Sequence, residues 1–161
     1  MRVSAKADYA LRALIELAGS ADGGPVSAEE LGKRQEIPHG FLQAILADLR
    51  KSGIVISQRG QSGGWRMGRD PESVSVADVI RAVDGPLANV RGDRPENVAY
   101  AGPAEKLTDV WIAVRASLRH VLERTSLADL SAGQLPEDVQ TLAEDPKAWI
   151  SLGRIRGTAA G

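Results

Sequence analysis

The chain contains no cysteine among its 161 residues. Disulfide bonds, thiolate-held metal ions and cysteine-ligated iron–sulfur clusters all need cysteine sulfur, so the sequence excludes all three and we expect no cofactor. Aromatic residues make up only 4% of the chain. The hydrophobic core must therefore consist mainly of Leu, Val, Ile and Ala.

Long apolar runs are also missing. No stretch of about 18 apolar residues is present, so we expect no membrane-spanning helix. Charged residues interrupt the first twenty positions, which therefore cannot form the apolar segment of a signal peptide. These absences predict a cytoplasmic protein without a membrane partner. The length suits one domain with an appended helical arm.

The sequence has little that indicates catalysis or metal binding. Its two histidines, His39 and His120, fall in different predicted helices, and neither has a carboxylate at metal-ligand spacing. No serine stands in a nucleophile-elbow motif. The glycine cluster at 60–64 lacks the lysine of a phosphate-binding loop. We therefore predict that the protein is not an enzyme.

Acidic residues are absent from positions 49–69, which carry five basic residues. Two short apolar stretches, 54–59 and 65–68, flank a glycine-rich tip and predict a β-hairpin with Trp65 anchoring its base. A basic hairpin of this size can contact DNA although the whole chain has a net charge of −1. We expect positive φ angles at three tip residues: Gly60, Gly63 and Gly64.

Two predicted helices joined by a tight turn, 27–35 and 38–52, precede the hairpin. Ser27 and Glu30 have the spacing of a capping box at the start of the first helix. A generic helical hairpin is the alternative for these helices alone, but the basic hairpin favours a mainly α fold with a winged helix-turn-helix. The second helix would then lie in a DNA major groove. The residues expected to face the bases are His39, Gly40, Phe41, Gln43 and Ala44.

Further helices are predicted over 4–19 and from Ser75 to position 84, where Asp78 completes a second capping pair. Residues 87–103 have the composition of a loop, and a long helix follows to about 125. Its apolar residues recur at alternating steps of four and three, which favours a partner helix over packing within its own domain. The predicted dimer interface consists of Leu107, Trp111, Val114, Leu118 and Val121. Short helical turns at 126–130 and 136–143 and a tail at 159–161 complete the chain.

Several of these segments resemble the Rrf2 family of bacterial winged-helix transcription regulators. The resemblance covers about residues 1–130. Six segments carry it: the opening at 1–13, the second-helix entry at 24–27, the recognition-helix end at 46–55, the hairpin tip at 59–65, and the segments 76–87 and 125–130. It implies a winged helix-turn-helix DNA-binding domain at 1–86, a sensor-type loop at 87–103 and a dimerisation helix at 104–130. Residues 131–161 would form a C-terminal extension.

The resemblance implies a homodimer that binds a partly palindromic operator in double-stranded DNA and represses transcription. Positions 39–44 would read the bases, and the hairpin would contribute Arg59 and Gly60. A winged helix used only for protein–protein interaction remains the alternative function. The expected phosphate contacts are Lys6, Arg50, Lys51 and Ser57.

The sensor-type loop is where this sequence departs from the family. Cluster-binding members place three cysteines there, whereas residues 87–103 of this chain contain none. Three alternatives therefore remain for the control of DNA binding: a small-molecule signal, a partner protein, or constitutive repression without any ligand. If a small-molecule effector binds, we expect it to contact Asn89, Arg91, Arg94, Asn97, Tyr100 and Trp111.

Overall fold

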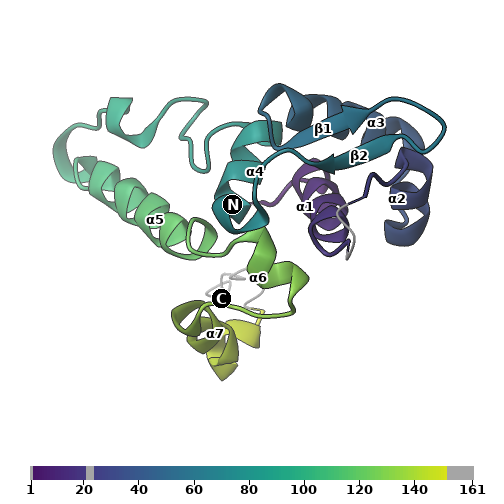
Figure 1. The fold of residues 1–161 in the computed structure, drawn as a ribbon. Coiled ribbons are helices and arrows are strands. Elements are labelled where there is room, and N and C mark those ends of the chain that lie inside the picture. Colours follow the sequence, from purple (N-terminus) through teal and green to yellow (C-terminus); the bar gives the residue numbers. More distant parts are fainter. Residues whose placement is uncertain (1, 21–23, 152–161) are drawn as a thin grey trace, which may run out of the picture.

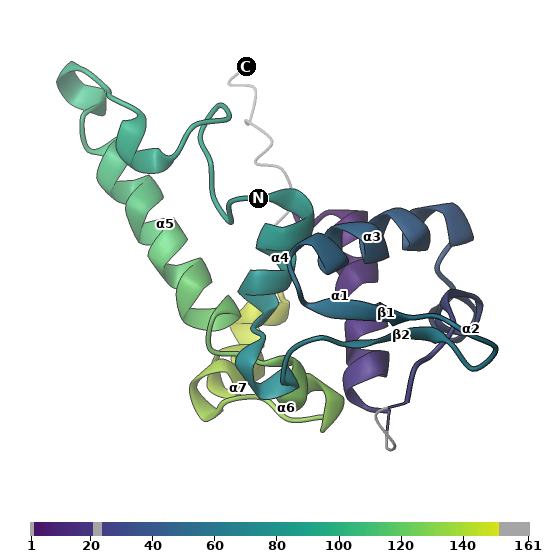
Figure 2. The ribbon, with the colours of Figure 1, turned by 45° about the horizontal axis from the view of Figure 1, so that its top comes forward.

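A computed structural model describes residues 2–20 and 24–151 of the chain, and the tail predicted at 159–161 lies outside them. The chain is mainly helical with one two-stranded sheet, and a body of α1–α4 and the hairpin stands beside a projecting α5 (Figures 1 and 2). The elements are α1 Ala5–Ala18, α2 Ala28–Gln35, α3 His39–Lys51, β1 Val55–Gln58, β2 Gly64–Met67, α4 Val76–Asp84, α5 Leu107–Leu122, α6 Leu127–Ser131 and α7 Glu137–Glu144. The predicted winged helix-turn-helix is confirmed.

The core lies where α1 packs against α2, α3, α4 and α6. α1, α3 and α4 each bury an aliphatic stripe at helical spacing, whereas α2 and α6 each bury a single leucine. Residues such as Leu14, Leu31, Leu46 and Val79 are fully buried. Aromatic side chains contribute only at its edge, where Tyr9 and Trp65 are partly buried. The scarcity of aromatic residues is thus matched by an aliphatic core.

Serine side chains cap the starts of four of these helices: α1, α2, α4 and α6. Ser75 and Asp78 form a complete capping box at α4. Ser27 caps α2 by accepting from the backbone N–H of Glu30, but the reciprocal bond of the predicted box is replaced by an ion pair of Glu30 with Arg34 at 2.8 Å. Arg34 lies one turn downstream on the same helix face, so it competes for the Glu30 carboxylate.

The hairpin pairs β1 with β2 in antiparallel register, with Ser57 opposite Trp65. Trp65 also exchanges two 2.8 Å backbone hydrogen bonds with Val26, which fixes the hairpin to the entry of α2. Only Gly60 of the three tip glycines has a positive φ, so the prediction was wrong for Gly63 and Gly64. Glycine is required at these two positions because a side chain does not fit. A Cβ atom at Gly63 would lie 2.4 Å from the Gln58 carbonyl oxygen, and one at Gly64 would lie 2.5 Å from that of Val26.

Replacing Gly64 with alanine is therefore expected to destabilise the fold. The methyl group would separate β2 from Val26, and overpacking of this kind costs about 1–3 kcal/mol of unfolding free energy. Urea unfolding followed by circular dichroism measures the change. Gly40→Ala is the matched control, because a Cβ at Gly40 meets nothing within 4 Å. Equal stability of the two variants would show that the contact at Val26 is not a constraint.

The segment 104–130 contains the predicted long helix as α5 and, after a break, the short helix α6. Pro103 belongs to a short 3-10 turn, so α5 begins at Leu107, and it ends at Leu122. Thr125 is buried, and its carbonyl accepts a 2.9 Å hydrogen bond from the Val76 N–H. Ser126 then starts α6 with a complete capping box. The helix ends before Thr125 because residues 125–127 pair with the entry of α4 and do not continue the helix.

The sensor-type loop packs against α5 through its own short turns. Pro95 and Val98 are buried, although the surrounding residues are mostly exposed. The hydroxyl of Thr108 donates to the Val98 carbonyl, and Arg115 of α5 forms an ion pair with Glu96. The short helices expected near 126–130 and 136–143 are present as α6 and α7. Within the described ranges no helix is both long and apolar enough to cross a bilayer.

Candidate nucleic-acid interface and neighbouring cavities

Helix α3 has two faces of opposite character. Leu42, Ile45, Leu46 and Leu49 are fully buried against the core. The other face carries all the residues predicted to contact bases, and each of them is exposed: His39, Gly40, Phe41, Gln43 and Ala44. Gln43 offers an amide that can both donate and accept hydrogen bonds, which suits it to read base edges.

A charged link fixes the orientation of this helix. The Lys6 ammonium donates to Asp48 Oδ2 and to the Val83 carbonyl, both at 2.8 Å, and so joins α1 to α3 and α4. Lys6 is thus engaged inside the protein, and its assignment as a phosphate contact stays a prediction. Lys51 bonds the other oxygen of Asp48 at 3.1 Å.

Asp48 is the one acidic residue of α3, and its charge is neutralised locally. The hydrogen bonds from Lys6 and Lys51 lower the pKa of the Asp48 carboxyl below its ordinary value. The carboxylate therefore stays ionised down to a lower pH than a free aspartate, and two lysines offset it. What remains at the end of α3 is the exposed, positively charged side chain of Arg50.

The hairpin lies beside α3 in both views and extends the basic surface (Figures 1 and 2). Arg59 and Gly60 stand at the exposed tip, Ser57 is exposed on β1, and Arg66 is exposed on β2. From Leu49 to Arg69 the chain carries no carboxylate, and the exposed side chains of Arg50, Arg59 and Arg66 lie on the end of α3 and on the hairpin. This is the arrangement that can approach a duplex without charge repulsion.

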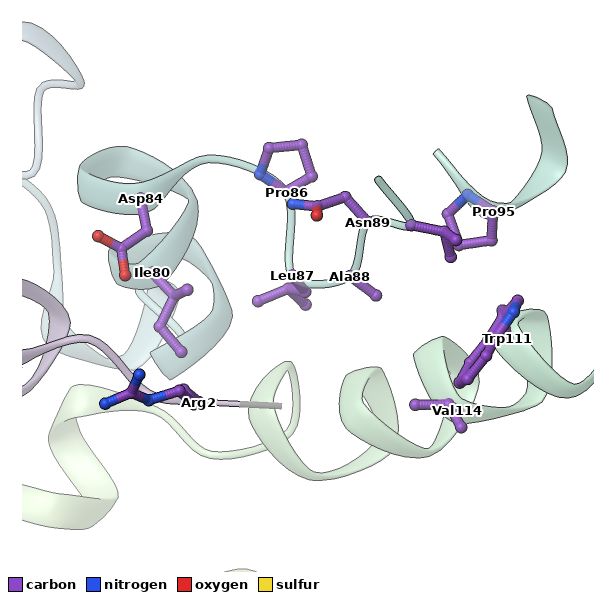
Figure 3. Close-up of a pocket in the computed structure, with 11 residues that line it drawn as sticks. Arg2, Ile80, Asp84, Pro86, Leu87, Ala88, Asn89, Pro95, Trp111 and Val114 are labelled. Atoms are coloured by element: carbon purple, nitrogen blue, oxygen red, sulfur yellow. The ribbon is translucent and has the colours of Figure 1, made fainter. Parts of the chain in front are cut away.

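A cavity of about 490 Å³ lies on the other side of α4, between α4, the turn after it and α5 (Figure 3). Arg2 and Asp84 stand at one end, and Trp111 and Val114 of α5 at the other. Of the six predicted effector residues, Asn89 and Trp111 line this cavity. Its mixed polar and apolar wall is of the kind that binds small organic molecules.

The other four predicted effector residues lie elsewhere. Tyr100 accepts a 3.1 Å hydrogen bond from Trp111 Nε1, and the Arg91 guanidinium lies 5.8 Å from the Tyr100 ring centroid. These contacts brace the loop behind the cavity. Arg94 lines a separate cavity of about 400 Å³, and Asn97 is exposed and lines neither cavity. The structure therefore does not bring the six residues into one site.

Helix α5 has no buried residue along its 16 positions. An apolar groove runs along one side of it, and the predicted seam residues Val114, Leu118 and Val121 line that groove. Trp111 turns instead toward Tyr100, and Leu107 is exposed where the helix begins. Val110 and Leu122 also line the groove and were missed, although they stand four residues from Val114 and Leu118.

Comparisons with known proteins agree on one class. The family model described as Rrf2, iron-dependent transcriptional regulator, matches residues 3–133. A Mycobacterium tuberculosis protein named for the HTH-type transcriptional regulators is 49% identical over 151 residues, which are 94% of either chain. The HTH-type transcriptional regulator CymR of Bacillus subtilis is 32% identical over 132 residues, covering 82% of this chain and 91% of that protein.

Solved structures show the same fold. The structure of CymR, titled the global cysteine regulator of B. subtilis, superposes with a TM-score of 0.71 at 30% identity and covers 83% of this chain and 98% of that one. The structure of IscR from T. potens has a TM-score of 0.64 at 29% identity and covers 95% and 94%.

The iron dependence in the family description was tested against the donor atoms of this chain. Cysteine sulfur is absent from the sequence. Across residues 2–20 and 24–151, no three or more His, Asp or Glu side chains are grouped so that they could hold a metal ion. The chain thus has no cysteine ligand for an iron–sulfur cluster, and its described residues offer no grouped set of nitrogen and oxygen ligands for an iron ion.

Proposed function

The chain belongs to the Rrf2 family of helix-turn-helix transcriptional regulators, and on that premise we propose that it is a homodimeric repressor that binds a partly palindromic DNA operator. The observation that carries the proposal is the exposed face of α3, with the polar side chains of His39 and Gln43, beside an acid-free basic hairpin. In this proposal Arg59 enters the minor groove, and base edges in the adjacent major groove are contacted by His39, Gly40, Phe41, Gln43 and Ala44. Arg50, Lys51 and Ser57 contact phosphates.

The groove of α5 supports the dimer. A helix without a single buried residue but with a continuous apolar groove is stabilised when another apolar surface covers it. In our proposal a second α5 provides that surface, because a two-fold interface is self-complementary and presents two copies of α3 to two half-sites.

The signal in this proposal is not a cysteine-held cluster. A small molecule seated in the cavity beside Asn89 and Trp111 would touch α4 and α5 together, so it could alter the angle between the winged helix and the dimer helix. A protein partner on the same loop could act in the same way. Either input would change the separation of the two copies of α3.

Selection of bound duplexes from fragmented DNA of the source genome tests the proposal. We expect recovered sites with two related half-sites about 10–10.5 base pairs, or a multiple, apart. The binding constant should fall linearly with salt on logarithmic axes, with a slope of about −0.9 for each phosphate neutralised. No enriched sequence and no retarded duplex at low salt would contradict the proposal and favour a protein-interaction module.

A further inference from the structure

Four arginines from three separate elements converge on the cavity of about 400 Å³ that Arg94 lines. Arg81 comes from α4, Arg115 and Arg119 from successive turns of α5, and Arg94 from the loop between these helices. Pro86, Leu87 and Ala88 add apolar surface to its lining. This cavity is distinct from the one in Figure 3, with which it shares only the turn residues 86–88.

Carboxylates do not balance these arginines. Glu96 is the one carboxylate that lines the cavity, and it is engaged by Arg115, which together with backbone hydrogen bonding lowers its pKa. Glu123, outside the lining, bonds Arg81 and is 3.7 Å from Arg119, so one carboxylate serves two guanidinium groups. Asp78 adds a contact of 3.6 Å to Arg81. Within the described ranges the Arg94 guanidinium forms neither an ion pair nor a hydrogen bond.

We propose that this cavity binds a small organic dianion, a phosphate monoester or a dicarboxylate. Guanidinium groups offer parallel N–H donors that match the oxygens of phosphate and carboxylate, and several around one cavity suit a ligand with two negative charges. The apolar surface at 86–88 accommodates a short carbon skeleton. The volume lies within the range of small-molecule pockets.

The position of the cavity separates it from the DNA-binding surface. Its lining elements lie on the α5 side of α4, whereas the hairpin extends to the opposite side of the body (Figure 1). A dianion bound there would join the end of α4, the loop and α5 through its own oxygens. That such a ligand acts as the signal of a repressor rests on the function proposed above, whereas its binding does not.

Thermal melting and isothermal titration calorimetry of the full chain test the site, with glycerol 3-phosphate, inorganic phosphate and succinate as probes and chloride at matched ionic strength as the reference. We expect saturable binding and a raised melting temperature with at least one organic dianion. Arg94→Gln combined with Arg119→Gln should weaken that binding at least about tenfold, because charge-assisted hydrogen bonds are lost. Arg91→Gln, in the same loop but against Tyr100, is the matched control and should bind as the unmodified chain does.

Three results would overturn the site. The first is no binding of any probe beyond the chloride reference. The second is equal binding by the Arg94/Arg119 double variant and the unmodified chain. The third is a loss of probe binding in Arg91→Gln as large as in the double variant, which would show that the loss does not depend on the arginines that line the cavity. Probe binding is measured without DNA, so a failure to find an operator does not change the conclusion about the anion site. A failure of the probes to bind likewise does not change the conclusion about DNA binding.

Discussion

Leu118→Glu is expected to convert the protein into a monomer and to lower its operator affinity by about 10²–10⁴-fold. Leu118 lies in the middle of the apolar groove of α5, where the proposed two-fold interface would bring the substituted carboxylates of both copies into an apolar surface. Loss of the dimer separates the two copies of α3. Each half-site is then bound independently, and the gain from linked binding disappears. Analytical ultracentrifugation and fluorescence titration of the operator measure the two effects.

Ile112→Glu is the matched control for that experiment. Ile112 is on the same helix, but it is exposed where Leu118 is half-buried, and it does not line the groove. It should remain dimeric and bind DNA as the unmodified chain does. Circular dichroism melting shows whether each variant is folded, which is expected because α5 contributes no buried residue to the core. A folded Leu118→Glu protein that is still dimeric would place the interface elsewhere.

The local parts of this fold could be predicted from the sequence because their causes are local. The aliphatic stripes of α1 to α4 and the basic hairpin between α3 and α4 are visible in short windows. The start of α6 is also indicated by a local motif, because Ser126 is followed three residues later by Asp129. The end of the long helix was expected at about 125 and not at Leu122, because the heptad pattern of α5 continues formally to Thr125. That pattern carries no information about the pairing of residues 125–127 with the entry of α4.

The parts that could not be predicted depend on residues distant in the sequence. Lys6 looked like a free cation, but its partners Asp48 and Val83 stand 42 and 77 positions away. The spatial need for Gly64 arises from Val26, which belongs to another element. The arginines of the second cavity are separated by up to 38 positions, and only the path of the loop brings Arg94 toward Arg115. The polar residues of the loop therefore predicted that a cavity is present, but they did not predict which of these residues line the same cavity.

Arg59→Ala is expected to weaken operator binding by about 1–3 kcal/mol, a factor of roughly 5 to 150 in the dissociation constant. Arg59 is exposed at the hairpin tip beside Gly60, whose positive φ turns the chain there. The hairpin base is held by Trp65 and Val26, so the tip is presented on a fixed support and its arginine reaches the minor groove at small entropic cost. Narrow minor grooves attract arginine through their enhanced negative potential.

Arg59→Lys separates the two contributions of that side chain. Lysine keeps the positive charge, so the salt dependence should stay as in the unmodified chain, whereas Arg59→Ala should reduce the slope by about one phosphate contact. Lysine lacks the planar fork of donors, so the ratio of operator to random-duplex affinity should fall in both variants. Fluorescence anisotropy at several salt concentrations, on operator and on random duplex, gives both quantities. If Arg59→Ala weakened binding to the two duplexes equally, the residue would be a phosphate contact without a part in recognition, and unchanged binding would remove the hairpin tip from the interface altogether.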